Sequence, residues 1–104
     1  ASVVGQKGVP GTSAYAASKT ALWGLTKALS VENARKNITI NNINLGYFDI
    51  GIIEQVPSSH KAALTASIPV GRFGDPINIV RSVEFIIENS DLCGVSLDVN
   101  GGLV

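Results

Sequence analysis

The sequence has 104 residues, 45% of them hydrophobic and 15% charged, and its eight basic side chains balance its eight acidic ones. This composition is typical of one small globular domain, and its scattered cations and short apolar runs argue against nucleic acid or a membrane as partner. The single cysteine, Cys93, excludes an internal disulfide and favours a cytoplasmic setting, and no metal-ligand spacing is present.

The first half of the chain predicts a strand, a helix and a second strand. Residues 1–12 hold three glycines and a proline after a β-branched start, which predicts the end of a strand running into an irregular loop. Helix-forming residues dominate from Ser13 to Lys36, and Asn37 suits the turn that ends this helix. Residues 38–45 are rich in isoleucine and asparagine, which predicts a short strand with polar positions.

The second half begins with a long excursion and returns to a helix and a strand. Short helices are expected at residues 52–55 and 59–67, on either side of Pro57. The pair Asp75-Pro76 is a strong helix start, and that helix is expected to run to about residue 88. Residues 95–99 predict a last strand. Strands that alternate with long helices predict a parallel α/β sheet.

One stretch of the first long helix combines packing residues with chemically active ones. In SAYAASK, Tyr15 and Lys19 are four residues apart, so they share one helical face. A free phenol titrates near pH 10, and a fixed cation beside it favours the phenolate. The pair is therefore either an acid–base pair or part of an ordinary amphipathic helix. A neighbouring face, with Trp23 beside it, carries only small residues and could pack on the sheet or on a second chain: Ala17, Ala21, Gly24 and Ala28.

Several segments then agree, in order, with one family. Ser2 lies thirteen residues before Tyr15, and GVPG (8–11), INNINLGYFDIGI (40–52) and IPVGRFGDPINIVRSVEFIIENSDLCGVSLDVNGG (68–102) complete the pattern. Together they resemble the short-chain dehydrogenase/reductase family, in particular members such as the 3-oxoacyl-acyl carrier protein reductases. The resemblance implies the C-terminal half of a Rossmann-type doubly wound parallel sheet with flanking helices. We expect residues 1–104 to be the catalytic, substrate-side part of one domain, without its N-terminal dinucleotide-binding half.

The resemblance also implies a set of catalytic residues, Ser2, Tyr15 and Lys19. Tyr15 would exchange a proton with the oxygen of a carbonyl or alcohol, while hydride moves to or from a nicotinamide. Ser2 would hydrogen-bond the same oxygen, and Lys19 would also anchor the nicotinamide ribose. The cofactor implied is NADP or NAD.

Cofactor contacts are implied for Tyr15, Lys19, Leu45, Gly46 and Phe48. Leu45-Gly46 stands where the family usually has Pro-Gly, and Phe48 stands where a main chain meets the carboxamide. Leu45 lacks the fixed φ of proline, and Ile50 replaces a threonine that hydrogen-bonds the cofactor. Both departures put conventional cofactor binding in question.

The excursion corresponds to the family's substrate lid. Its few charges favour a nonpolar substrate, and His60 is expected to be a surface residue of the lid.

Two functions remain open at this point. The first is an NAD(P)-dependent oxidoreductase that acts on a small carbonyl or alcohol and forms a homo-oligomer, a dimer or tetramer. The second is a catalytically inert fragment or pseudo-enzyme that acts as a packing or oligomerisation module. We expect the isolated fragment to be inactive in either case.

Overall fold

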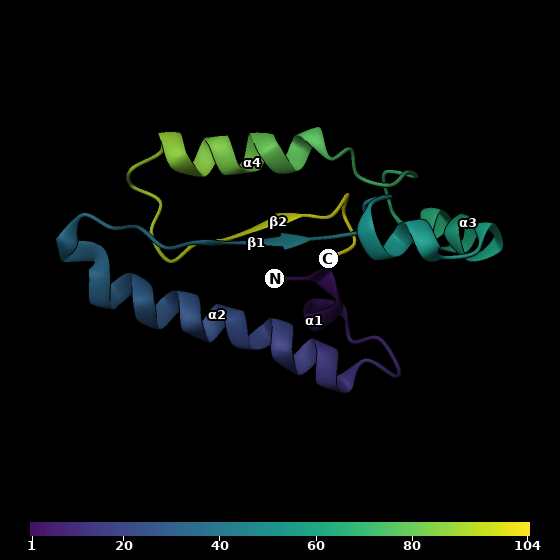
Figure 1. Cartoon of the computed structure of the whole chain (residues 1–104), viewed down its shortest axis with the longest axis horizontal. Coiled ribbons are helices and arrows are strands. Elements are labelled where there is room, and N and C mark those ends of the chain that lie inside the picture. Colours follow the sequence, from purple (N-terminus) through teal and green to yellow (C-terminus); the bar gives the residue numbers. More distant parts are fainter.

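The centre of the molecule is a small parallel sheet. In the computed structural model, which describes residues 1–104, β1 (Asn42–Leu45) pairs with β2 (Ser96–Val99), and Asn42 lies opposite Ser96 (Figure 1). Ser2 adds a single parallel bridge to Leu45, which brings a third segment of the chain alongside β1. The predicted parallel α/β arrangement is confirmed.

Helices cover both faces of this sheet. Figure 1 shows α4 (Ile77–Glu88) on one side of the strands and α1 (Val3–Lys7) with α2 (Ser13–Asn33) on the other. A short 3-10 turn, η1 (Ala34–Lys36), continues α2, and Asn37 then ends it with a left-handed φ of 61°. The sequence predicted this stop because asparagine tolerates that conformation. No helix has both the length and the hydropathy needed to cross a membrane.

The prediction for residues 1–12 is wrong over residues 3–7, which form α1 instead of strand or loop. Ser2 has extended dihedral angles and its side chain accepts a hydrogen bond from the Val4 amide at 3.2 Å, so it caps the helix. Gly8, at φ 71°, ends it. Val3 is only 1% exposed, and its burial outweighs the weak helix propensity of a β-branched residue.

The remaining elements follow the sequence closely. The strands are shorter than expected, since pairing is limited to Asn42–Leu45 and Ser96–Val99. Both short helices of the excursion are present, as η2 (Gly51–Gln55) and α3 (Ser58–Ser67). At the start of α4, the Asp75 carboxylate accepts a hydrogen bond from the Ile77 amide at 3.1 Å, as a capping residue should.

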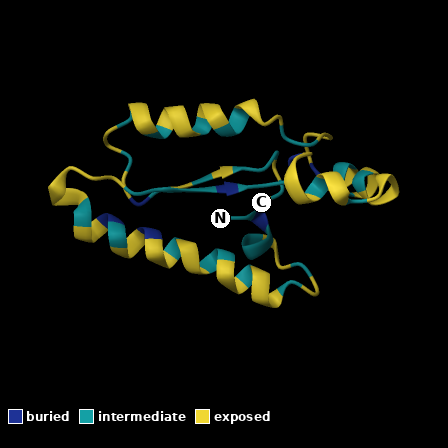
Figure 2. Cartoon of the chain, viewed as in Figure 1, coloured by how far each residue is buried: buried dark blue, intermediate teal, exposed yellow.

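The core of this chain is thin. Only seven of the 104 residues are buried, and the accessible surface is 6580 Å², whereas a compact monomer of this mass exposes about 5,500 Å². The radius of gyration is 15.1 Å, compared with about 13 Å for a compact domain of this length. Figure 2 shows exposed residues along the outer sides of α2 and α4 and few buried ones, near the strands and at the end next to α3. Residues 1–104 therefore expose more surface than a compact domain of this length does.

We therefore expect residues 1–104, expressed alone, to self-associate. Exposed apolar side chains such as Leu25, Phe85 and Ile87 would drive the association. Light scattering at several concentrations should give a mass above 10.8 kDa that rises with concentration. A stably folded monomer at all concentrations would contradict the expectation.

Candidate active site

Ser2 and Tyr15 line the same cleft. Its volume is about 310 Å³, and its walls include Thr12, Gly46 and Tyr47 beside these two residues. The cleft lies where the strands end, close to η2, whose Ile52 and Ile53 form its outer wall. Ligands of open α/β sheets bind at this carboxyl edge, so the cleft has the position expected of a binding site.

Two contacts hold Ser2 in place. Its backbone pairs with Leu45, and its Oγ accepts the hydrogen bond from Val4, which leaves the hydroxyl hydrogen free to donate. A Cβ on Gly5 would lie 2.6 Å from Thr20 Oγ1, so the glycine allows α1 to lie directly against α2. This close packing sets the distance between the strand end with Ser2 and the helix with Tyr15.

Tyr15 lies in the first turn of α2 and is 49% exposed. The Lys19 ammonium lies 5.4 Å from the centre of the Tyr15 ring, over its face. Tyr15 thus brings a phenol and Ser2 a hydroxyl to one cleft, and the Lys19 cation lies over the ring of that phenol.

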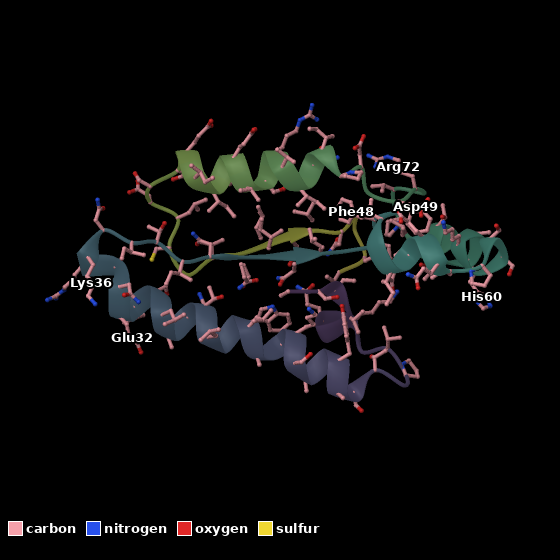
Figure 3. The ribbon with its side chains drawn as sticks, viewed as in Figure 1. Glu32, Lys36, Phe48, Asp49, His60 and Arg72 are labelled. Atoms are coloured by element: carbon pink, nitrogen blue, oxygen red, sulfur yellow. The ribbon has the colours of Figure 1, made fainter.

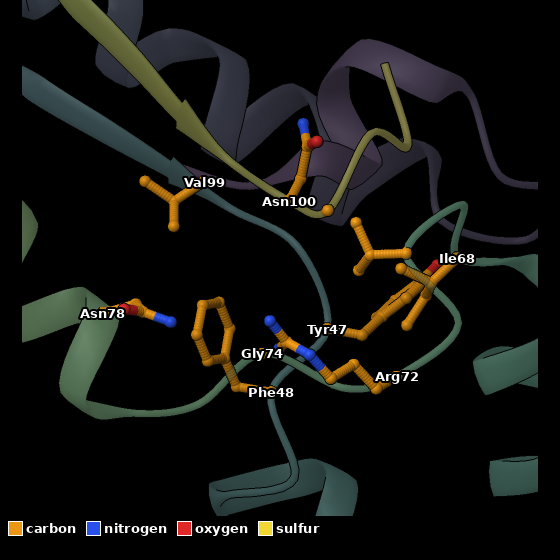
Figure 4. A pocket seen from close by; sticks show the side chains of 10 residues that line it. Tyr47, Phe48, Ile68, Arg72, Gly74, Asn78, Val99 and Asn100 are labelled. Atoms are coloured by element: carbon orange, nitrogen blue, oxygen red, sulfur yellow. The ribbon is translucent and has the colours of Figure 1, made fainter.

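Gly46 and Phe48 are fixed by packing inside the molecule. A Cβ on Gly46 would lie 2.7 Å from the Asn100 Cα, so the glycine is needed for the ends of β1 and β2 to approach. Phe48 is 6% exposed, and its ring lines a separate cavity of about 110 Å³ with Arg72 and Asn78 (Figure 4). Only the main chain of Phe48 is therefore available to a ligand at the edge of the sheet.

The sequence of this chain is similar to those of known reductases. The family described as enoyl-(acyl carrier protein) reductase matches residues 1–104. The chain is 37% identical, over 99% of its length, to a 3-oxoacyl-[acyl-carrier-protein] reductase FabG of Rickettsia bellii, of which it covers 44%. It is 39% identical, over 98% of its length, to a human 3-oxoacyl-[acyl-carrier-protein] reductase and to carbonyl reductase family member 4 of Xenopus tropicalis, covering 42% of each.

The chain belongs to the short-chain dehydrogenase/reductase family. It spans less than half the length of these curated relatives. Its parallel strands and flanking helices are those of a Rossmann-type α/β fragment of such a dehydrogenase/reductase. Leu45, in the place of the usual proline, keeps its N–H, which donates to the Ala1 carbonyl at 3.4 Å. Proline has no such donor, so Leu45 gains a hydrogen bond while it loses the fixed φ.

The segment that the resemblance assigns to a substrate lid, residues 50–67, includes η2 and α3. An ion pair of 2.9 Å joins Lys61 of α3 to Asp49, but both side chains are partly exposed, so the pair contributes little to stability. Ile50 is 42% exposed, and its side chain has no group that can form a hydrogen bond. His60 is exposed on α3, and Figure 3 shows it and Asp49 at the lid end of the molecule, far from Glu32 and Lys36. His60 lines a second cleft, between α3 and the loop before α2.

Sequence reasoning missed two features of the site. Tyr47 lines the same cleft as Ser2 and Tyr15, and the only signal for it was an aromatic residue between Gly46 and Phe48. The second is a polar network: Trp23 Nε1 donates to Asn44 Oδ1 at 2.8 Å, and Asn44 Nδ2 donates to Asp98 at 2.8 Å. Trp23 thus points to its own sheet, while the small residues of α2 face outward.

The contact between Gly46 and Asn100 can be tested by substitution. Gly46→Ala should lower the free energy of unfolding by about 1–3 kcal/mol, because the added methyl must displace the end of β2. The control is Ser59→Ala, at an exposed position of α3, where a change within about 0.5 kcal/mol is expected. Chemical denaturation of the complete protein measures both. Equal stability of the two variants would show that Gly46 is not constrained.

Proposed function

We propose that this segment carries the catalytic residues of an NAD(P)-dependent oxidoreductase that interconverts a carbonyl compound and an alcohol. The observation that carries the proposal is that Ser2 and Tyr15 line one cleft, with the Lys19 ammonium over the Tyr15 ring. Membership of the short-chain dehydrogenase/reductase family and relatives that are named reductases support it.

In the reducing direction, the residues of this chain handle the carbonyl oxygen. The Tyr15 hydroxyl donates its proton to that oxygen as the carbonyl carbon gains a hydride, so a carbonyl, a hydride and a proton give an alcohol. Ser2 donates a hydrogen bond to the same oxygen with the hydroxyl hydrogen that its capping role leaves free. The Lys19 cation stabilises the phenolate that remains, and oxidation of an alcohol reverses each transfer.

The residues present fit the nicotinamide end of NADP or NAD. A bound dinucleotide supplies or accepts the hydride. Lys19, whose ammonium lies 5.4 Å from the centre of the Tyr15 ring, would hold the ribose, and the backbone at Leu45, Gly46 and Phe48 would meet the carboxamide. These three residues follow one another at the carboxyl edge of the sheet, where such contacts form.

Removal of the Tyr15 hydroxyl tests this function. In the complete protein that carries these residues, Tyr15→Phe should lower kcat by at least about 100-fold, because the proton donor is lost. The measurement is carbonyl-dependent oxidation of a reduced nicotinamide cofactor. Ser18→Ala removes a hydroxyl from the same turn, where it donates only to the Tyr15 carbonyl, and should retain activity. Unchanged turnover in Tyr15→Phe would refute the assignment.

A second candidate, association through α2, is favoured by one observation. All four small residues of its neighbouring face are exposed, and a Cβ on Gly24 would meet no atom within 4 Å. A flat, small-residue helix face allows another helix to approach closely. We propose that this face contacts a second copy of the protein, in a dimer or tetramer, whether or not the site is active.

A charge on this face should weaken the association. Ala21→Arg places a long cation at the centre of the face, so light scattering of the complete protein should show a smaller mass. Ala66→Arg, on the exposed side of α3, is the matched control and should leave the mass unchanged. If Ala21→Arg keeps the mass of the unmodified protein, α2 is not the contact.

A further inference from the structure

Two clefts meet at a single side chain, that of Tyr47. The first is the catalytic cleft of about 310 Å³ with Ser2 and Tyr15. The second, which we call the lid cleft, has a volume of about 570 Å³ and lies between the loop before α2 and helix α3. Tyr47 is the one residue that lines both of them.

The backbone of Tyr47 is held on both sides. Immediately before it, the Gly46 amide donates to the Val99 carbonyl at 2.9 Å. The Tyr47 carbonyl accepts from the Gly74 amide at 2.8 Å, and Phe48 forms a parallel bridge with Gly74. These bonds tie the loop to β2 and to the segment that follows the lid. The backbone of Tyr47, from which the ring extends, is therefore held between β2 and the segment at Gly74.

A third cavity shows how the ring lies. Tyr47 also lines the small cavity of about 110 Å³ that contains Phe48 and Arg72. Figure 4 shows the Tyr47 ring extending from the loop toward Ile68, away from Phe48. Tyr47 is half-buried and lines the small inner cavity as well as the catalytic cleft and the lid cleft. It therefore separates the two clefts.

The lid cleft is suited to an apolar chain. Its walls include Val9 and Pro10 on one side and Val56, Ala63 and Leu64 on the other. Lys7 and His60 are its only ionisable side chains besides Tyr47, and both are exposed to solvent. The catalytic cleft alone, at about 310 Å³, is at the lower limit of ligand pockets, so a longer substrate needs the second cleft.

We propose that Tyr47 is a specificity-determining residue of this site. A carbonyl group held at Ser2 and Tyr15 places its apolar tail across the Tyr47 ring and into the lid cleft beside Leu64. Compounds with long tails gain these contacts, and compounds with short tails do not. The inference rests on the proposed oxidoreductase function and adds to it the residue that selects substrates by length.

The test compares two linear ketones, butan-2-one and decan-2-one, by their kcat/KM values in the complete protein. Each methylene in an apolar pocket discriminates substrates substantially, so Tyr47→Ala should lower the preference for decan-2-one by at least about tenfold. The loss should be mainly in KM, because the tail contacts bind the substrate before and during the reaction alike. Tyr47→Phe keeps the ring and should keep the preference.

A second pair of variants tests whether the substrate's tail reaches Leu64 in the lid cleft. Leu64→Asp places a carboxylate in the apolar lid cleft and should also lower the preference for decan-2-one by at least about tenfold. Ala62→Asp adds the same charge to the same helix outside the cleft, and should leave activity and preference unchanged. Hydrogen exchange gives a readout without catalysis: decan-2-one should protect amides of residues 58–67, and butan-2-one should not.

The outcomes separate the two proposals. If Tyr15→Phe is inactive but neither Tyr47→Ala nor Leu64→Asp changes the preference, the oxidoreductase function stands and the role of Tyr47 is refuted. If Tyr15→Phe keeps full activity, the proposed function itself fails. A preference lost in Tyr47→Ala, retained in Tyr47→Phe and lost in Leu64→Asp supports the inference.

Discussion

The buried amide of Asn44 is the constraint on which the rest of the arrangement depends. Its side chain is 1% exposed, and an amide buried without partners would cost several kcal/mol. Trp23 and Asp98 satisfy its two ends, and Gln6 donates to the same Asp98 carboxylate at 2.9 Å. The network joins β1 to α2, β2 and α1 at once. It therefore fixes the rotation of α2 about its axis, and with it the direction in which Tyr15 faces.

The site itself combines rigid and loose parts. Ser2, Tyr15 and Tyr47 lie on elements that are tied to the sheet, while the lid is joined to them through short turns and one exposed ion pair. Reactive groups need accurate positions, and a substrate needs a way in and out. In the proposed enzyme, the elements tied to the sheet would position Ser2 and Tyr15, and the segment with η2 and α3 would let the substrate enter and leave. Tyr47 lies between these two parts.

Much of the fold could be predicted from the sequence, because the signals were local. Asp75-Pro76, Asn37 and the alanine-rich run from Ser13 set helix ends and helix content by short-range chemistry. Residues 3–7 were predicted wrongly because the burial of Val3 and the Ser2 cap override propensity. The Asn44 network could not be predicted because it depends on the register of two strands, with Asn44 and Asp98 54 residues apart. The position of Tyr47 between two clefts could not be predicted because separate segments of the chain form their walls.

The parallel pairing of β1 with β2 has a consequence for biosynthesis. Asn42 pairs with Ser96, which is synthesised 54 residues later, so β1 cannot pair with β2 until then. At ribosomal rates of about 5–20 residues per second, the edge of β1 that faces β2 stays unpaired for roughly 3–11 s. A nascent strand of isoleucine alone would invite intermolecular pairing during that time. Asparagines at positions 41, 42 and 44 keep the waiting segment hydrated, and the same amides later become its ties to Leu92, Ser96 and Asp98.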